Sequence, residues 1–123
     1  MVVADTDILI SAIRDNEIAK SLIKKYCNEL AVSAITVAEL YVGATNAKKK
    51  KAVNDILNDA DFVEINKVIT HTTIRLIKEY NTATRQLLMP DAFIAATCLE
   101  HDARLLTFNT KDFKFIKGLK LAK

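Results

Sequence analysis

A chain of 123 residues that is 50% hydrophobic and 27% charged has the length and composition of one soluble globular domain. Its 2 glycines and 1 proline are too few for the closely spaced glycines of a P-loop or a dinucleotide-binding motif, which excludes those two classes of nucleotide-binding enzyme. The net charge of +3 suits a polyanionic partner without requiring one.

The cysteines and the apolar runs indicate the compartment. Cys27 and Cys98 form no C-x-x-C motif, and Cys98 lies in an apolar segment, so we expect reduced core thiols and neither a disulfide nor a zinc site. No apolar run approaches the roughly 20 residues that a membrane span requires, and no charged segment precedes the first apolar run. We therefore expect a cytoplasmic protein that is neither exported nor embedded in a membrane.

Short apolar strands and amphipathic helices alternate along the chain. The expected order is a strand at 1–4, a helix that is capped by Thr6 or Asp7 and runs to 14, a helix at 16–26, a strand at 30–32, and helices at 35–45 and 48–58. There follow a strand at 62–65, a helix at 68–80, a loop at 81–89, a helix at 90–100, a strand at 105–107, a turn or short helix at 109–113 and a possible edge strand at 119–121.

This alternation predicts an α/β fold with one domain over residues 1–123. Strands that are apolar on both faces indicate a mostly parallel central sheet of four to five strands, covered by helices in a three-layer α/β/α arrangement. In such sheets, ligands bind beyond the carboxyl ends of the strands where the strand order reverses. Asp5 follows the first strand, so we expect it at such a position.

Three acids stand in segments that are otherwise almost free of charge. Glu39 is the only charged residue between 30 and 47, Asp91 is the only one between 86 and 99, and Asp5 ends an apolar run. Each acid alone could be a helix cap or a surface carboxylate. Together, three carboxylates without basic partners would repel one another unless a cation holds them, and oxygen ligands select Mg²⁺ or Mn²⁺ over zinc.

Four sequence motifs resemble those of the PIN domain family. Residues 5–10, D-T-D-I-L-I, resemble its D-T/S-N-x-L-I opening, and residues 33–44 fit the S-x-x-T-x-x-E-L-x-x-G-A pattern of VapC-type toxins. Residues 90–96, P-D-A-F-I-A-A, are similar to the third motif, and residues 106–113, L-T-F-N-T-K-D-F, to the closing T-x-N/D-x-x-D-F motif. The four motifs follow the family's order and span the chain.

The resemblance implies an Mg²⁺- or Mn²⁺-dependent endoribonuclease, the toxin of a toxin-antitoxin pair. It assigns Asp5, Glu39 and Asp91 to the metal, and Thr6 and Thr107 to the outer shell, where their hydroxyls orient the carboxylates. The implied products carry 5′-phosphate and 3′-hydroxyl ends. The implied partners are an RNA substrate, a cognate antitoxin and a second copy of the chain, with the surface around Tyr41, Val42, Ile56 and Leu57 used for docking.

The chain departs from the family pattern at two places. Asp7 stands where the family often has Asn or Ser, and it adds either an outer-shell acid or a helix cap. Asn109 stands where many members have an acid, and Asp112 follows three residues later. We predict Asn109 as the fourth catalytic residue and place Asp112 in the outer shell, although Asn109 and Asp112 also have the spacing of a helix N-cap and its N3 residue.

Basic residues give weaker signals. We expect Arg85, on the loop before Asp91, and Lys111 to contact RNA phosphates, and Lys48 to Lys51 to form a solvated helix face. The expected positions of His71 and His101 are in the core or at a helix end.

Two other functions fit parts of the sequence. A haloacid-dehalogenase-like phosphatase would use Asp5 as the nucleophile and Asp7 as the general acid. A non-catalytic binding module could use the same fold with a degenerate site at Asn109.

Overall fold

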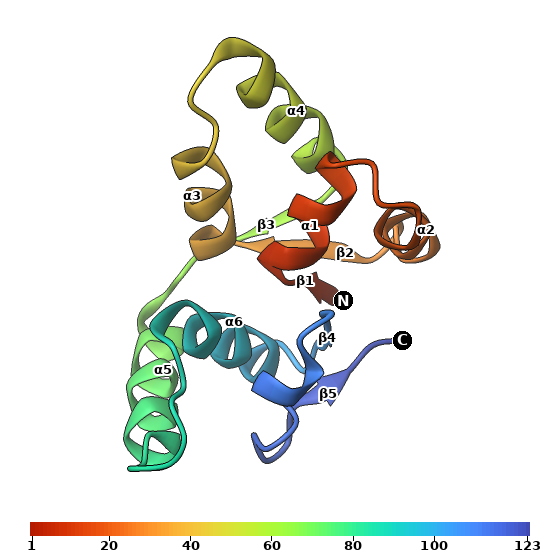
Figure 1. Ribbon diagram of the computed structural model, residues 1–123. Helices are drawn as coiled ribbons and strands as arrows, with labels where there is room; N and C mark the ends of the chain where they lie inside the picture. Colours follow the sequence, from red (N-terminus) through yellow and green to blue (C-terminus); the bar gives the residue numbers. More distant parts are fainter.

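The computed structural model describes residues 1–123 and has five strands in one sheet (Figure 1). The strands are β1 (Val2–Ala4), β2 (Leu30–Ser33), β3 (Asp61–Val63), β4 (Arg104–Leu106) and β5 (Lys120–Leu121). Their order across the sheet is β3-β2-β1-β4-β5, and every neighbouring pair is parallel. The predicted α/β class is confirmed, with a sheet that is wholly parallel and includes the fifth, edge strand.

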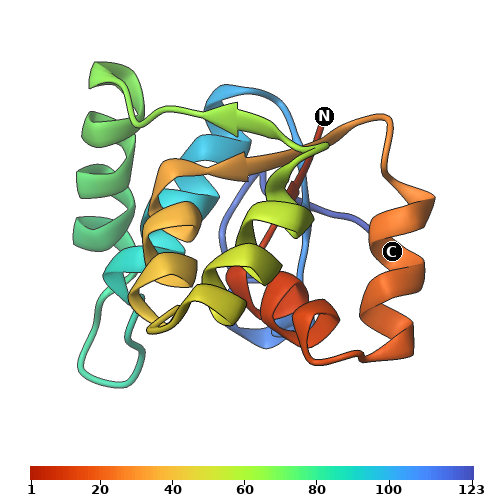
Figure 2. The same cartoon turned by 90° about the horizontal axis from the view of Figure 1, so that it is seen from above.

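Six α-helices cover the two faces of this sheet. They are α1 (Thr6–Ile13), α2 (Glu17–Lys25), α3 (Ala34–Val42), α4 (Ala47–Leu57), α5 (Lys67–Tyr80) and α6 (Met89–Glu100), and a 3₁₀ helix, η1 (Thr110–Asp112), follows β4. Helices α1, α3 and α4 lie over one face, and α5 and α6 pack together on the other (Figures 1 and 2). None of the helices is both long and apolar enough to cross a membrane.

Polar side chains set where most helices begin. Asn16, Asn46 and Asn66 each accept a hydrogen bond from the backbone N–H three residues later, at 2.9 Å, and so cap α2, α4 and α5. Helix α1 is capped by Asp5, whose Oδ1 accepts from the Thr6 N–H at 2.8 Å. The prediction that Thr6 or Asp7 caps this helix is therefore wrong, because the extended backbone at Asp5 already places its carboxylate over the first free amide.

The central strands alternate their side chains between two cores. Val3 and Ala31 pack with α5 and α6, whereas Ala4 and Val32 pack with α1, α3 and α4. Strand β3 does not follow the expectation of burial on both faces, since Phe62 is 58% exposed. It lies at the edge of the sheet, where fewer elements cover it.

The two cysteines are free and differ in environment. Cys98 is buried in α6, as expected, but Cys27 is exposed after α2, so the expectation of two core thiols is wrong for Cys27. The apolar side chains of α2 that face the sheet come from positions before Cys27, which leaves this residue in the turn that leads to β2.

Candidate active site

Asp5 lies where the strand order reverses, between β1 and β4. The chain leaves β1 at Asp5 and leaves β4 at Thr107, and the two strands are neighbours in the sheet. The Asp5 N–H donates to the Leu106 carbonyl at 2.9 Å, and the Thr107 hydroxyl donates to Asp5 Oδ2 at 2.8 Å. The carboxyl ends of these two strands therefore form the floor of the candidate site, as the general rule for parallel sheets predicts.

The Asp5 carboxyl is held in an environment that opposes its charge. It is only 5% exposed, and burial together with the charge of Asp7 and, more weakly, that of Asp91 raises the pKa of Asp5 to about 7. The hydrogen bonds from Thr107 and from the Thr6 N–H act in the opposite direction without offsetting burial. A buried carboxyl of this kind needs a nearby cation to be a stable anion at neutral pH.

A threonine on α1 connects Asp5 to Glu39 on α3. The Thr6 hydroxyl donates to Glu39 Oε1 at 2.8 Å, and the Thr36 hydroxyl lies 3.1 Å from the same Thr6 oxygen. Thr36 is one helical turn before Glu39 and is fully buried, so the two side chains share the inner face of α3. The hydrogen bond to Glu39 is consistent with the outer-shell role expected for Thr6, which is to orient a carboxylate. Thr36 is not among the predicted site residues, although it is the threonine of the motif at residues 33–44.

Asp91, in the first turn of α6, brings the third acid to the same edge of the sheet. Burial raises the pKa of Asp91 to about 6, and the charges of Asp112, Glu39 and Asp7 add to the shift in that order. Its charge also acts on Asp5. The three predicted metal ligands therefore lie close enough to affect one another, although they come from three segments far apart in the sequence.

The turn between β4 and η1 is fastened to the start of α1 by Asp7. Asp7 Oδ2 accepts from the Phe108 N–H at 3.1 Å, and the Asn109 N–H donates to the Thr107 hydroxyl at 3.0 Å. Asp7 Oδ1 is buried and has no hydrogen-bond partner. Asp7 is thus an acid of the site and does not cap α1.

Asp112 is the acid of the closing motif, and its charge affects the pKa of Asp91; Asn109 is neutral. The Asn109 side chain is exposed and makes no hydrogen bond to the amides of η1, so the helix-cap alternative has no contact behind it. No hydrogen bond joins its carboxamide to the other site residues, and the charge of Asp112 is the first of those that raise the pKa of Asp91. Asn109 as the fourth catalytic residue, with Asp112 in the outer shell, stays a prediction.

No basic side chain neutralises these acids. The protein has seven ion pairs, and none of them contains Asp5, Asp7, Glu39, Asp91 or Asp112. The Arg85 guanidinium stacks on the Phe115 ring, 4.3 Å from its centroid, and Lys111 is exposed on η1 and forms no ion pair. Five acids consequently share one edge of the sheet without a protein cation.

Carboxylate oxygens without a positive partner fit a hard divalent cation. The unpartnered Asp7 Oδ1 and the raised pKa values of Asp5 and Asp91 are both features that such a cation would relieve. No three acidic, histidine or cysteine side chains are gathered closely enough to hold an ion together. The arrangement therefore suits an ion that takes one or two carboxylates directly and reaches the others through water, which is how Mg²⁺ commonly binds.

Cys98 lies under the site and stays uncharged. Burial, with a smaller contribution from the Asp5 charge, raises the pKa of Cys98 to about 12. A thiol so hard to ionise is neither a nucleophile nor a metal ligand at neutral pH. Its position on α6, two turns after Asp91, makes it part of the apolar wall that buries Asp5.

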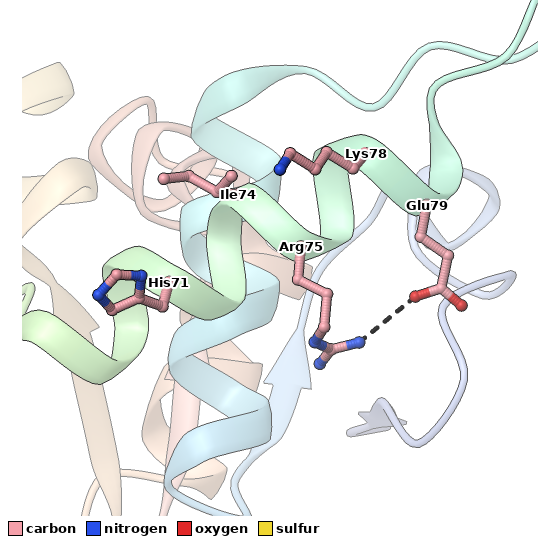
Figure 3. Close-up of a pocket in the computed structure, with 5 residues that line it drawn as sticks. All are labelled: His71, Ile74, Arg75, Lys78 and Glu79. Carbon is pink, nitrogen blue, oxygen red and sulfur yellow. Dashed lines mark hydrogen bonds and ion pairs between the residues drawn. The ribbon is translucent and has the colours of Figure 1, made fainter.

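Two hollows in the protein surface differ in whether acids of the candidate site line them. One is shallow and is lined by five side chains on the outer side of α5: His71, Ile74, Arg75, Lys78 and Glu79 (Figure 3). An Arg75–Glu79 ion pair at 3.3 Å occupies part of it, and no predicted site residue lines it. His71 is thus exposed in mid-helix, contrary to expectation, whereas His101 ends α6 as expected.

The second hollow is a groove between α1, α3 and α4. It has a volume of about 450 Å³ and is lined by apolar side chains from all three helices, including Ile10, Leu40 and Val53. Of the five acids only Glu39 lines it, together with the basic residues Arg14, Lys48 and Lys49.

Comparison with known proteins identifies the family of the chain. The PIN domain model matches residues 2–119. The curated relative ribonuclease VapC1 of Rickettsia felis is 27% identical, over 97% of this chain and 92% of the relative, and ribonuclease VapC10 of Mycobacterium tuberculosis is 25% identical, over 98% and 91%.

Solved structures agree with this result. A toxin-antitoxin complex from Klebsiella pneumoniae contains a chain that is 31% identical, with a TM-score of 0.83 over 97% of this chain and 95% of that one. VapBC2 from Rickettsia felis, bound to a promoter DNA fragment, has a TM-score of 0.89 at 22% identity over 99% and 98%, which supports the fold. With the four motifs and the cluster of acids already described, these matches show that the chain belongs to the PIN domain family.

Proposed function

We propose that this protein is an Mg²⁺- or Mn²⁺-dependent endoribonuclease and the toxin of a toxin-antitoxin pair. The observation that carries the proposal is the cluster of five acids at the carboxyl edge of the sheet, with no ion pair to any of them. The names of the curated relatives, ribonucleases VapC1 and VapC10, support RNA as the substrate class. Location in the cytoplasm, where RNA and an antitoxin would be met, is part of the proposal.

Each acid would have a distinct task. Asp5, Glu39 and Asp91 would hold the cation, while the Thr107 and Thr6 hydroxyls keep Asp5 and Glu39 in fixed orientations through bonds of 2.8 Å. When bound, the cation supplies a Lewis acid that activates water and neutralises charge on the phosphate. Asp112, whose charge acts on Asp91, would stand in the outer shell beside it.

The alternative phosphatase receives no support from the structure. Its general acid would be Asp7, but Asp7 Oδ2 is occupied by the Phe108 N–H and Asp7 Oδ1 is buried. Membership of the PIN domain family also argues against a haloacid-dehalogenase-like enzyme.

The direct test is cleavage of RNA by the purified protein. We expect cleavage of single-stranded RNA in Mg²⁺ or Mn²⁺, with new 5′-phosphate and 3′-hydroxyl ends, and complete loss of cleavage in EDTA that is restored by excess Mn²⁺. Cleavage sites are mapped by sequencing the product ends. Cleavage that survives EDTA would contradict the assignment.

The same preparation also tests the non-catalytic alternative. Mn²⁺ should raise the melting temperature of the protein because it binds only the folded state, and Asp91→Asn should reduce that increase. An increase without any RNA cleavage would favour a binding module that has kept the metal site but not the activity.

We further propose two protein partners. The groove between α1, α3 and α4 is lined by apolar side chains and by Glu39, Arg14, Lys48 and Lys49, and we assign it to an antitoxin segment, which would cover Glu39 when bound. The end of α3 is also apolar and uncovered, with Val42 81% exposed and Tyr41 39% exposed, and we assign it to the homodimer. The structures from Klebsiella pneumoniae and Rickettsia felis are themselves complexes of toxin and antitoxin or VapBC assemblies, which supports the first partner.

The homodimer has a simple test. We expect the wild-type protein to have twice the monomer mass of 13.7 kDa by light scattering, and Val42→Asp to shift it to the monomer because a charge would be buried in the interface. The matched control is Ile18→Asp, at a residue that is 66% exposed on α2 and should leave the mass unchanged. A wild-type monomer at all concentrations would contradict this assignment.

A further inference from the structure

Phe108 is an exposed aromatic residue directly beside the acids. It is 43% exposed, and it follows Thr107, whose hydroxyl binds the Asp5 carboxylate. None of the three core clusters contains it. Leaving a phenyl ring partly in water forgoes the free energy that burial would provide, so its position calls for another contact.

The backbone that carries Phe108 is fixed on both sides. Its own N–H donates to Asp7 Oδ2 at 3.1 Å, and the next N–H, that of Asn109, donates to the Thr107 hydroxyl. Leu106 before the turn and Phe113 after it also anchor the turn, because each residue is at most 1% exposed. The backbone that carries the ring is therefore fixed next to the site.

The acidic surroundings limit how RNA can be held there. Phosphate contacts need basic side chains, and residues 106–113, which carry Phe108, include only one, Lys111, whereas Arg14, Lys48 and Lys49 line the groove beside Glu39. Aromatic side chains offer the other common way to hold single-stranded nucleic acid, by stacking on the face of a base. In a duplex both faces of each base are covered by its neighbours, so only an unpaired base is available.

We propose that an unpaired nucleobase next to the scissile phosphate stacks on the Phe108 ring. This inference rests on the proposed ribonuclease function and specifies its substrate as RNA that is single-stranded at the cleaved bond. Asp7 then acts as a positioning residue, because its bond to the Phe108 N–H sets the place of the platform relative to Asp5. Stacking tolerates any base, so Phe108 supplies affinity and register more than base identity.

The test combines a variant of Phe108 with removal of single bases from the RNA. A short RNA containing a mapped cleavage site is made with an abasic residue at each position around the cleaved bond in turn. For the wild type, we expect one position at which the missing base lowers kcat/KM by about 5- to 100-fold, the usual range for one stacked base. Phe108→Ala should show the same loss on intact RNA, mainly in KM, and no further loss at that position.

Two variants serve as controls. Phe108→Trp should keep the wild-type kcat/KM and the wild-type dependence on the base, whereas Phe108→Leu, which keeps the bulk but not the ring, should behave as Phe108→Ala. Phe62→Ala removes a ring that is 58% exposed on the far edge strand and should change nothing.

The outcomes separate this inference from the function on which it rests. Equal sensitivity to base removal in the wild type and in Phe108→Ala and Phe108→Leu, with normal cleavage, would overturn the stacking proposal alone. Failure of the wild type to cleave any RNA would overturn the ribonuclease function, and the stacking proposal with it. Loss of the single sensitive position in both variants, with retention in Phe108→Trp, supports the proposal.

Discussion

Asp5→Asn is expected to reduce kcat/KM for RNA cleavage by more than about a hundredfold. Replacing an outer-shell partner of a metal site typically costs about 10- to 100-fold, and Asp5 would be a direct ligand whose charge is also lost. The fold should survive, because the asparagine carbonyl can still accept from the Thr6 N–H and the side chain keeps its volume. The measurement is steady-state cleavage in Mn²⁺ at saturating and limiting RNA.

Matched variants show whether the loss is specific to the site. Thr6→Val removes the hydroxyl that orients Glu39 and should cost about 10- to 100-fold, whereas Thr6→Ser keeps the hydroxyl and should stay near the wild type. Asp61→Asn removes a carboxylate that is exposed on β3 and should have no effect. If Asp5→Asn and Asp61→Asn cleave equally well, Asp5 is not a ligand and the site lies elsewhere.

The metal-free protein is expected to lose stability as the pH rises, in contrast to most proteins with buried acids in ion pairs. The pKa of Asp5 is raised to about 7 in the folded state from 3.8. Between these two values the folded protein therefore binds a proton that the unfolded chain releases, and the free energy of unfolding falls as the pH increases. Above about pH 7 the cost is of the order of 4 kcal/mol, and Asp91 contributes in the same direction.

Urea denaturation in EDTA at pH 5, 6, 7 and 8 measures this effect. Asp5→Asn has no titrating group at this position, so it should be more stable than the wild type at pH 8, and the difference should shrink as the pH falls toward 4. Adding Mg²⁺ at pH 8 should restore stability to the wild type far more than to Asp5→Asn. If the free energy of unfolding changed with pH in the same way in both proteins, ionisation of Asp5 would not destabilise the folded state.

The raised pKa values of Asp5 and Asp91 should make metal affinity depend on pH. If Asp5 and Asp91 hold the metal as proposed, binding requires their ionised forms, and the affinity for Mg²⁺ should increase with pH through about 7. On the proposed function, the acids that destabilise the metal-free protein at neutral pH are the same acids that would bind the metal.

Local patterns in the sequence were enough to predict most of the elements and three of the acids. The α/β class, the order of strands and helices, and Asp5, Glu39 and Asp91 as isolated acids followed from apolar periodicity and from where charges are scarce. These features depend on residues within a few positions of one another, because a helix or strand that buries one face must carry a matching local pattern. The predicted cap of α1 was wrong by one or two residues, which is the usual uncertainty in where a helix begins.

Only the tertiary structure decided which residues of the site form hydrogen bonds with one another. Thr107 binds Asp5 across 102 positions of sequence, Thr6 reaches Glu39 across 33, and Asp7 holds Phe108 across 101. No local pattern predicts such contacts, because they depend on the β3-β2-β1-β4-β5 order that places the ends of β1 and β4 side by side. The sequence by itself determined that this chain gathers unpaired acids on a parallel sheet. Long-range packing decided that the charge of Asp112 affects Asp91, that Asp7 fastens a turn, and that Phe108 is exposed beside it.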